Sequence, residues 1–275
     1  MNISFEVYPP KKEGSFETAF DVVGRLSLLT PEFISVTYGA GGSESKKTLD
    51  IASYIQNECN TEAVAHLTCI GNTHEEILAK CQDFQKKNIH SVLALRGDRP
   101  KDMTDEQFNR REFAHATDMI RFLKENSKLR IMAACYPEKH FEANSIEEDL
   151  QYMKEKQDLG VESFLSQLFF DNSCFYRFRE RAQQVGITKP VCAGIMPITS
   201  AKQIGTTVKL SGSSVPKRLA DIIAKYSESP EDMYQAGIDY AVEQISDLQN
   251  NAVDGIHIYT MNKPQVAEEI IKNLQ

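Results

Sequence analysis

The amino-acid sequence predicts a closed (β/α)8 barrel, and three observations lead to that prediction. Eight short runs rich in β-branched and aromatic residues recur along the 275 residues. Most of these runs start about 30 residues after the previous one, which is the length of one strand–helix unit. A barrel of this kind usually needs about 250 residues, so the chain length fits. The predicted strands are residues 3–8, 33–38, 63–70, 91–97, 130–136, 163–170, 191–198 and 255–261.

The first strand, ISFEVY at residues 3–8, carries a carboxylate within an otherwise apolar strand pattern. Side chains alternate along a strand, so Ser4, Glu6 and Tyr8 share one face and the apolar residues share the other. We expect the apolar face to pack on the helices and Glu6 to face the barrel axis. Two prolines follow, and because neither has an N–H to donate to the sheet, the strand ends just beyond Glu6.

The intervals between the strands show helical patterns with recognisable ends. THEE at residues 73–76 is a capping-box pattern, and another helix begins at Ser145 and ends before Gly160, a C′ glycine. The interval between strands seven and eight is long and holds three helical stretches, the last opened by Ser229 and Pro230. Helices are predicted over 15–29, 73–87, 107–125, 145–159, 172–185, 200–210, 216–226, 230–249 and 264–274.

No linker or shift in composition divides the chain. We therefore predict a single domain over residues 1–275, with extra helices between strands seven and eight. A doubly wound open sheet is the alternative, and that fold often carries G-x-G-x-x-G after its first strand. The glycine cluster here, Gly39-Ala-Gly41-Gly42, follows the second strand and has Glu44 in place of the third glycine. The barrel is therefore favoured.

Composition argues against several classes of protein. The net charge is −8 and no block rich in Lys or Arg occurs, which argues against nucleic-acid and anionic-membrane binding. The six cysteines form no C-x-x-C pair, so neither a metal site nor a disulfide framework is expected. No signal-peptide pattern occurs, and no apolar run approaches the ~20 residues of a membrane span. We therefore expect a protein of the reducing cytoplasm.

Seven of the eight predicted strands carry polar or ionisable side chains near their carboxyl ends. In a barrel these ends meet at one mouth, where barrel enzymes place their catalytic groups. The middles of the strands are apolar or small, so the polar ring indicates an active site. Its members are Glu6, Thr37, Tyr38, His66, Thr68, Arg96, Asp98, Tyr136, Glu138, Gln167, Asp171, Tyr259 and Thr260.

Individual members of this ring also have structural interpretations. Burial in a pocket would raise the pKa of Glu6 and keep a proton available near neutrality, whereas the alternative is an edge carboxylate paired with a lysine. His66 alone fits a hydrogen-bonded core histidine, Asp98 a turn cap, and Arg96 a local partner of Asp98. His257 has no obvious partner in the sequence and is interpreted as structural.

Several mechanisms lack the residues they need. A Schiff-base enzyme needs a lysine at a strand end, and none of the eight strands contains one. Neither H-E-x-x-H nor G-x-S-x-G occurs, which argues against a zinc hydrolase and a serine hydrolase of those types. Isolated acids, amides, hydroxyls and aromatics remain. They suit a bound organic cofactor that supplies the chemistry while the protein orients the substrate and supplies a proton.

Eight segments in order resemble the methylenetetrahydrofolate reductase family, flavin-dependent barrel enzymes of one-carbon metabolism. They are SFEVYPP, FISVTYGAGG, AHLTCI, ALRGD, YPEKH, SQLFFD, GIMPIT and IHIYTMN, which together run from residue 3 to about residue 263. The resemblance implies a bound FAD that takes a hydride from NADH or NADPH. The nicotinamide then leaves, and methylenetetrahydrofolate binds in the same place and is reduced to 5-methyltetrahydrofolate. It also implies ping-pong kinetics, a role in methionine biosynthesis, a cytoplasmic location and a homo-oligomer.

The resemblance also implies site residues. Glu6 matches the acid that protonates the departing nitrogen of the folate, and Asp98 matches a catalytic aspartate near the flavin and the pterin. Substrate contacts are implied for Glu6, Asp98, Gln167, Met261 and Lys263. FAD contacts are implied for Thr37, His66, Arg96, Gly97, Asp98, His115, Ala134, Tyr136, His140, Asp149 and Lys156. Lys156 lies one turn before Gly160 and could reach a phosphate, although a solvated helix lysine is the alternative.

Two positions depart from the family pattern. His115 stands where relatives usually have a tyrosine, and Thr207 where some relatives place an aromatic residue that stacks on the substrate.

Two other functions stay open. One is a pterin-binding barrel that transfers a methyl group without flavin, and the other is a non-catalytic barrel within a larger complex. The sequence does not distinguish NADH from NADPH as the donor.

Overall fold

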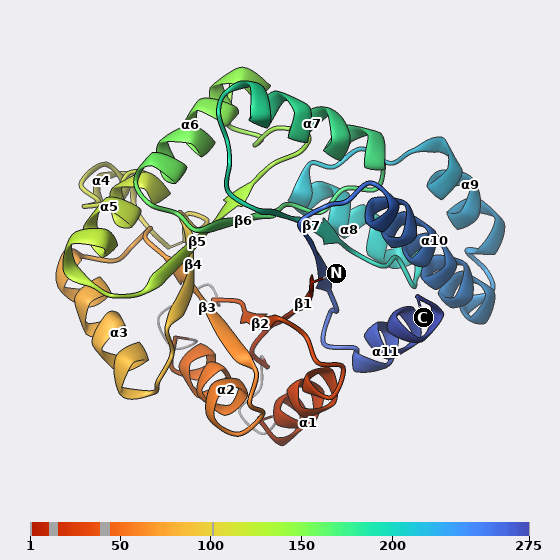
Figure 1. Cartoon of the computed structure of the whole chain (residues 1–275), viewed down its shortest axis with the longest axis horizontal. Coiled ribbons are helices and arrows are strands. Elements are labelled where there is room, and N and C mark those ends of the chain that lie inside the picture. Colours follow the sequence, from red (N-terminus) through yellow and green to blue (C-terminus); the bar gives the residue numbers. More distant parts are fainter. Residues whose placement is uncertain (1, 11–15, 39–44, 101, 275) are drawn as a thin grey trace.

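The computed structural model describes residues 2–10, 16–38, 45–100 and 102–274. Its eight parallel strands form one closed barrel in the order β1-β2-β3-β4-β5-β6-β7-β8, with helices around the outside (Figure 1). The predicted (β/α)8 barrel is therefore confirmed. The strands are β1 (Asn2–Val7), β2 (Phe33–Val36), β3 (Glu62–Thr68), β4 (Ser91–Leu95), β5 (Arg130–Cys135), β6 (Ser163–Ser166), β7 (Val191–Ile195) and β8 (Gly255–Tyr259). Each ends one to four residues earlier than predicted, because the last residues leave the sheet at the mouth.

The helices follow the predicted pattern with two differences. The bounds are α1 (Phe16–Ser27), α2 (Ser45–Asn57), α3 (His74–Lys86), α4 (Asp105–Asn109), α5 (Ala116–Asn126), α6 (Ile146–Asp158), α7 (Asn172–Gln184), α8 (Ala201–Ser211), α9 (Lys217–Tyr226), α10 (Pro230–Asn250) and α11 (Pro264–Asn273). No range was predicted for α2. The single helix predicted over 107–125 is wrong, because two helices, α4 and α5, occupy this interval.

Local capping explains that division. Thr104 caps α4 through the backbone N–H of Gln107, so this helix begins before the predicted range. Asp118 accepts hydrogen bonds from the backbone N–H groups of Ala114 and His115, both at 2.9 Å, and so fixes the start of α5. Phe113 lies in the segment that connects the two helices. Its side chain is buried and anchors this segment to the core.

Closure of the barrel depends on β1, which pairs with β2 on one side and with β8 on the other. In this register Ser4 lies beside His257, and Glu6 lies beside both Ser35 and Tyr259. Residues from the two ends of the chain thus become neighbours on the inner face. The alternation predicted for β1 holds, since Phe5 and Val7 are buried in the layer between the strands and the helices.

The inside of the barrel has an apolar layer and a polar region. The apolar layer consists of Phe33, Val64, Leu93, Met132, Leu165 and Cys192. Further toward the carboxyl ends of β2 and β3, on the same inner face, Ser35 and His66 are buried polar residues, and Ser4 and His257 are buried beside them. Because buried polar groups cost free energy unless they are hydrogen-bonded, this region needs an explanation beyond packing.

The three helices between β7 and β8 form the predicted insertion and lie together beside β7 (Figure 1). They pack on a separate apolar cluster of Leu168, Phe170, Ile198, Leu219 and Met233. Gly237 of α10 comes so close to the loop after β7 that a Cβ there would lie 2.1 Å from the Ile198 carbonyl oxygen. The insertion is therefore held against the mouth of the barrel by backbone contact.

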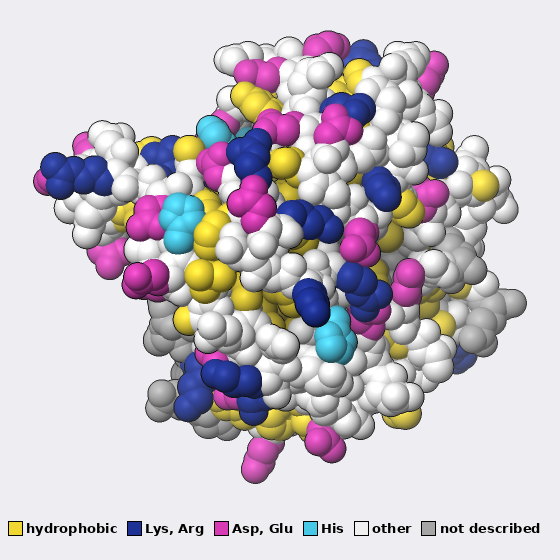
Figure 2. Space-filling view, turned by 60° about the vertical axis from the view of Figure 1, so that its left-hand side comes forward, with side chains coloured by type: hydrophobic (Ala, Val, Ile, Leu, Met, Phe, Trp, Pro, Cys, Tyr) yellow, Lys and Arg dark blue, Asp and Glu magenta, His cyan; other side chains and the backbone are white. Residues whose placement is uncertain are grey.

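The described part of the chain contains no helix long and apolar enough to cross a membrane. All six cysteines are free, and Cys69, Cys135 and Cys192 are buried, as expected of thiols in apolar runs. Figure 2 shows basic and acidic side chains interspersed over the face turned toward the viewer, without a large area of one sign.

We expect Gly237→Ala to destabilise the protein by roughly 1–3 kcal/mol, because the added methyl group meets backbone that cannot move without displacing the insertion. Gly205→Ala is the matched control. Gly205 also lies within a helix, but nothing lies within 4 Å of the added Cβ, and alanine should stabilise that helix by about 0.5–1 kcal/mol. Urea denaturation of both variants measures the two changes, and equal effects would contradict the close approach.

Candidate active site

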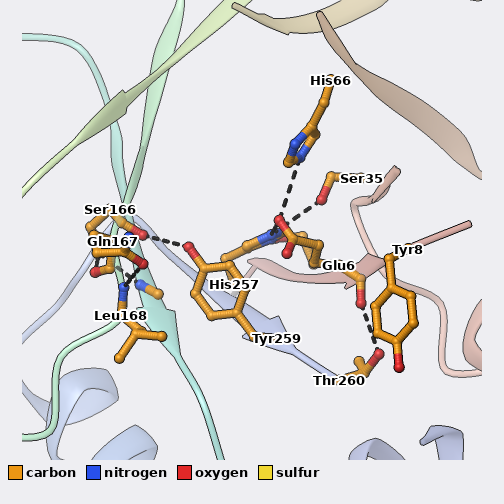
Figure 3. Close-up of polar contacts among 12 residues, drawn as sticks. Glu6, Tyr8, Ser35, His66, Ser166, Gln167, Leu168, His257, Tyr259 and Thr260 are labelled. Carbon is orange, nitrogen blue, oxygen red and sulfur yellow. Dashed lines mark hydrogen bonds and ion pairs between the residues drawn. The ribbon is translucent and has the colours of Figure 1, made fainter. Parts of the chain in front are cut away.

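The centre of the candidate site is the carboxylate of Glu6, which points from β1 into the barrel mouth (Figure 3). Its Oε2 lies 3.4 Å from Nε2 of His66 on β3 and 3.9 Å from Nε2 of His257 on β8. The side chain of Glu6 is 21% exposed, whereas those of His66 and His257 are 8% and 0% exposed. We call Glu6, His66 and His257, together with Ser4 and Ser35, the acid cluster.

His257 is bonded on both ring nitrogens. Its Nδ1 lies 2.7 Å from the Ser4 hydroxyl, and its Nε2 lies 3.3 Å from the Ser35 hydroxyl. The ring also stacks on Phe33 and meets the edge of Tyr259. The absence of an evident partner in the sequence was therefore misleading. Its partners stand on β1 and β2, far away in the sequence, and become neighbours only when the barrel closes.

The two histidines determine the charge of Glu6. Burial alone would raise the pKa of the carboxyl group, but the interactions with His257 and His66 outweigh it and lower this pKa from 4.5 to about 2. The prediction that burial leaves Glu6 with a raised pKa is therefore wrong. The physical reason is that two imidazoles stabilise the ionised form. Apart from this contact with Glu6, the buried His66 Nε2 has no hydrogen-bond partner within the described chain.

Tyr259 and Gln167 form another wall of the mouth. The Tyr259 hydroxyl donates to the Ser166 carbonyl at 2.8 Å, and its pKa is raised well above the ordinary value by burial and by the charge of Glu6. The side-chain amide oxygen of Gln167 accepts the backbone N–H of Leu168 at 2.9 Å. The NH2 group of the same side chain is left to donate elsewhere. The neighbouring strands β6 and β7 also approach closely here, since a Cβ on Gly194 would lie 2.4 Å from the Ser166 carbonyl oxygen.

The loop after β8 supplies the rim beside Glu6. Asn262 accepts the backbone N–H of Tyr8 at 3.0 Å and donates to its carbonyl at 2.8 Å, which ties this loop to the end of β1. Met261 is 39% exposed on this rim. Lys263 extends toward Thr199, at 3.5 Å between Nζ and Oγ1. The structure thus places Met261 and Lys263 at the same mouth as Glu6.

A second cavity opens beside the mouth, at the ends of β4 and β5 and against α5 and α6. Its volume is about 180 Å³, smaller than the roughly 300–1,000 Å³ usual for small-molecule sites. We call it the cation pocket because Arg96 and Lys156 line it. Seven of the predicted flavin contacts line this pocket: Arg96, His115, Ala134, Tyr136, His140, Asp149 and Lys156. The other predicted contacts, Thr37, His66, Gly97 and Asp98, do not line it.

Lys156 does not point into solvent, so the alternative of a solvated helix lysine is wrong. Its Nζ donates to the Ala134 carbonyl at 3.0 Å, and burial lowers its pKa while the charge of Asp149 opposes that change. Asp149 accepts the backbone N–H of His140 at 2.9 Å, and burial raises its pKa. Arg96 pairs with Glu142, with Nη2 and Oε1 2.8 Å apart, rather than locally with Asp98.

The remaining predicted residues lie between or beside the two parts of the site. Gly97 has φ of +81°, and a Cβ there would lie 2.9 Å from the Thr68 Cβ, so glycine is required. Asp98 follows it and is exposed. Thr37 directly follows β2, and its carbonyl accepts the Thr48 hydroxyl at 2.9 Å. The glycines at 39–42 lie outside the described residues. Within the described chain, no three His, Cys, Asp or Glu side chains are grouped to hold a metal ion.

The two departures from the family pattern also have definite places. His115 precedes α5, lines the cation pocket and stacks with Tyr152 at 6.4 Å between ring centroids. Thr207 is buried in α8, where its hydroxyl lies 3.5 Å from the Met196 sulfur. His115 thus retains a ring at the pocket, whereas Thr207 offers no aromatic surface to a ligand.

The fold and the grouping of ionisable side chains at the carboxyl ends of its strands define a protein of the (β/α)8-barrel class. The chain belongs to the methylenetetrahydrofolate reductase family, because the family model of that name matches residues 1–275. A 5,10-methylenetetrahydrofolate reductase of Pectobacterium carotovorum subsp. carotovorum is 33% identical over 274 residues, covering 100% of this chain and 90% of that protein. The one of Escherichia coli (strain K12) is 32% identical over 274 residues, with the same coverage.

Plant relatives and solved structures extend these comparisons. Methylenetetrahydrofolate reductase (NADH) 1 of Arabidopsis thaliana is 34% identical over 284 residues, which cover 98% of this chain and 48% of that protein. A Clostridium thermocellum protein that binds two copies of 5-methyl-5,6,7,8-tetrahydrofolic acid superposes with a TM-score of 0.72 at 14% identity, covering 99% of this chain and 93% of that one. At that identity the likeness shows the barrel fold.

We expect Glu6 to make stability fall on acidification. Because the pKa of Glu6 is about 2 in the folded protein against 4.5 ordinarily, its contribution is complete above about pH 4.5 and is lost as the pH falls toward 2. Over that range the wild type should lose up to about 1.4 kcal/mol per pH unit more than Glu6→Gln. Urea unfolding between pH 5 and pH 3 measures the difference. The exposed Glu228→Gln serves as the control, and wild-type behaviour in Glu6→Gln would contradict the low pKa.

Proposed function

We propose that this protein reduces 5,10-methylenetetrahydrofolate to 5-methyltetrahydrofolate with a hydride that comes from NADH or NADPH. The observation that carries the proposal is the carboxylate of Glu6, placed between two histidines at the mouth of a barrel whose whole length matches the reductase family. The names of its relatives support the same substrate. A single mouth that both substrates enter in turn would give ping-pong kinetics.

We infer that FAD is the resident cofactor and that the cation pocket holds part of it. A dinucleotide needs cationic partners for its diphosphate, and Lys156 and Arg96 line the pocket. Ala134 lines the same pocket from β5, and the carboxylates of Glu142, Glu148 and Asp149 line it as well. Bound FAD supplies a ring that accepts a hydride from the nicotinamide and returns it to the folate.

The residues around the pocket would hold the cofactor in distinct ways. The ammonium group of Lys156 donates one hydrogen bond to the Ala134 carbonyl. Its other N–H groups remain to donate to an anion. Burial raises the pKa of Tyr136, so its hydroxyl remains a neutral hydrogen-bond donor. Gly97 lets the backbone after β4 pass close to the mouth, and Asp98 follows where we propose that it contacts the flavin and the pterin. Thr37 and His66 would contact the flavin from β2 and β3.

Glu6 would act on the folate nitrogen. The one-carbon bridge of the substrate opens only when its departing nitrogen receives a proton, and Glu6 is the acid at the mouth. Since Glu6 is ionised in the free protein, it must first receive a proton from a neighbour or from water. Gln167 would donate its amide N–H2 to the substrate, and Lys263 at the rim suits the carboxylates of the folate tail. Met261 would cover the substrate from the same rim.

The location, assembly and metabolic role stay predictions. We expect a cytoplasmic homo-oligomer that contributes to methionine biosynthesis. The two alternatives, a flavin-free methyl carrier and a non-catalytic subunit, predict no yellow colour or no turnover by the isolated protein, respectively.

The two half-reactions test the proposed function together with the role of Glu6. Wild-type protein loaded with FAD should lose the absorbance band of oxidised flavin, near roughly 450 nm, when NADH is added anaerobically. It should regain this band when methylenetetrahydrofolate is added. In Glu6→Gln the first change should survive, while the second slows by a factor of roughly 10² to 10⁴, as expected for loss of a general acid. Equal loss of both half-reactions would refute the acid role, and a wild type that shows neither would refute the function.

Lys156 should decide how tightly the flavin binds. Lys156→Gln removes the charge facing the pocket and should weaken FAD binding by about tenfold or more, since a hydrogen bond to a charged group contributes about 1.5–3 kcal/mol. Lys154→Gln lies on the same helix but pairs with Asp158 outside the pocket, so binding should be unchanged. Flavin fluorescence titration measures both affinities. Equal affinities for the two variants would contradict the assignment of the pocket.

A further inference from the structure

The polar region beneath Glu6 has features that packing alone does not require. Ser4, Ser35 and His257 are 2%, 0% and 0% exposed, yet they occupy the interior of a barrel. The same interior is filled by apolar side chains such as Leu93 and Met132 in the neighbouring layer. Replacing apolar packing with buried hydroxyls and an imidazole costs stability unless each polar atom is bonded. The arrangement therefore indicates a role that depends on the imidazole.

The hydrogen bonds assign the proton of the His257 ring. The Ser4 hydroxyl donates its hydrogen to the Ile256 carbonyl, at 3.3 Å. Its oxygen is then the acceptor for His257 Nδ1, at 2.7 Å, so Nδ1 carries a hydrogen. Nε2 is left as the nitrogen that gains or loses a proton. It faces the Ser35 hydroxyl at 3.3 Å and the Glu6 carboxylate at 3.9 Å.

The surroundings of Nε2 restrict where its proton can go. The titratable groups around the ring are Glu6 from β1, His66 from β3 and Tyr259 from its own strand. Tyr259 already donates its hydroxyl hydrogen to Ser166 and stays neutral. Glu6 is the anion among them, and it is the member of the group with 21% of its side chain exposed at the mouth. A proton on Nε2 therefore has one outward acceptor, the Glu6 carboxylate.

We propose that His257, oriented by Ser4, is a positioning residue that holds the proton which Glu6 delivers to the folate nitrogen. This proposal rests on the proposed function. The proton reaches Nε2 from water at the mouth before the folate reacts. When the folate is bound, the proton passes from Nε2 to Glu6 and from Glu6 to the departing nitrogen. His257 is then neutral and Glu6 ionised, and water at the mouth restores the proton after the product leaves.

The proposal separates the two half-reactions. Hydride transfer from the nicotinamide needs no proton from Glu6, so His257 should matter only for the folate step. It also predicts a pH signature. With this proton store beside Glu6, the rate of the folate step should depend less steeply on pH. Without that store, Glu6 must take each proton from water, and the rate should rise as the pH falls, by up to tenfold per pH unit.

Two substitutions at this position separate the ring nitrogens. His257→Asn retains a donor near the place of Nδ1 and loses Nε2. We expect flavin reduction by NADH within about twofold of wild type, flavin reoxidation by methylenetetrahydrofolate slowed at least tenfold near pH 7.5, and the pH dependence described above. His257→Gln places its amide nearer to Nε2 but holds no exchangeable proton of suitable pKa, so the same pH dependence is expected.

Ser4→Ala keeps the proposal testable if substitution of a fully buried histidine prevents folding, because it removes a single hydroxyl group. It should slow reoxidation by about three- to tenfold with the same direction of pH dependence. Ser91→Ala is the matched control, since this buried hydroxyl at the start of β4 donates to Glu62 at 2.7 Å and does not contact His257, so its pH profile should follow the wild type.

Stopped-flow absorbance of FAD-loaded protein measures both half-reactions from pH 6 to pH 8. A wild-type pH profile in His257→Asn, or equal slowing of the two half-reactions, would overturn the role of His257 while leaving the proposed function intact. A wild-type protein whose reduced flavin is not reoxidised by methylenetetrahydrofolate would instead overturn the proposed function.

Discussion

The parallel pairing of β1 with β8 is the contact on which the rest of this structure depends. It closes the sheet, so no strand is left with an unpaired edge. Its register also places Ser4 beside His257 and Glu6 beside Tyr259. Because side chains alternate with a period of two, a slip of one residue would turn all of these groups outward and bring Phe5 and Val7 into the mouth. The contact that completes the barrel therefore also assembles the acid cluster from the two ends of the chain.

Glu6 shows how strongly local charge competes with burial. An isolated carboxyl group in this position would favour its neutral form, whereas the neighbouring histidines keep it ionised. Such a buried arrangement of charges is weak evidence for stability, since apolar residues of similar volume often serve as well. Under the proposed function, its value would lie in a proton held within reach of the folate. The pKa of Glu6, and with it the change of stability with pH, thus depends on Glu6, His66 and His257 together.

Sequence patterns predicted the barrel, because each strand–helix unit carries its own period and caps. They also predicted that Glu6 faces inward. They did not reveal the role of His257, since Ser4 becomes its partner only through closure. The division of 107–125 into two helices depends on Asp118 capping backbone groups before α5, which apolar periodicity does not encode. The inward position of Lys156 was equally hidden, because α6 buries only Leu150 and Met153. The residues of the cation pocket came from family resemblance, not from spacing.

The mouth of the barrel offers few groups able to give a proton near neutrality. Burial raises the pKa values of the Tyr136 and Tyr259 hydroxyls and of the Cys135 thiol, so these groups hold their protons too tightly. Asp149 is committed to the backbone of His140 in the cation pocket, and Lys156 to the carbonyl of Ala134. Under the proposed function, flavin binding and proton delivery would fall to different strands, β4 and β5 for the first and β1, β3 and β8 for the second. That separation would let one mouth accept a nicotinamide, which needs no acid, and then a folate, which does.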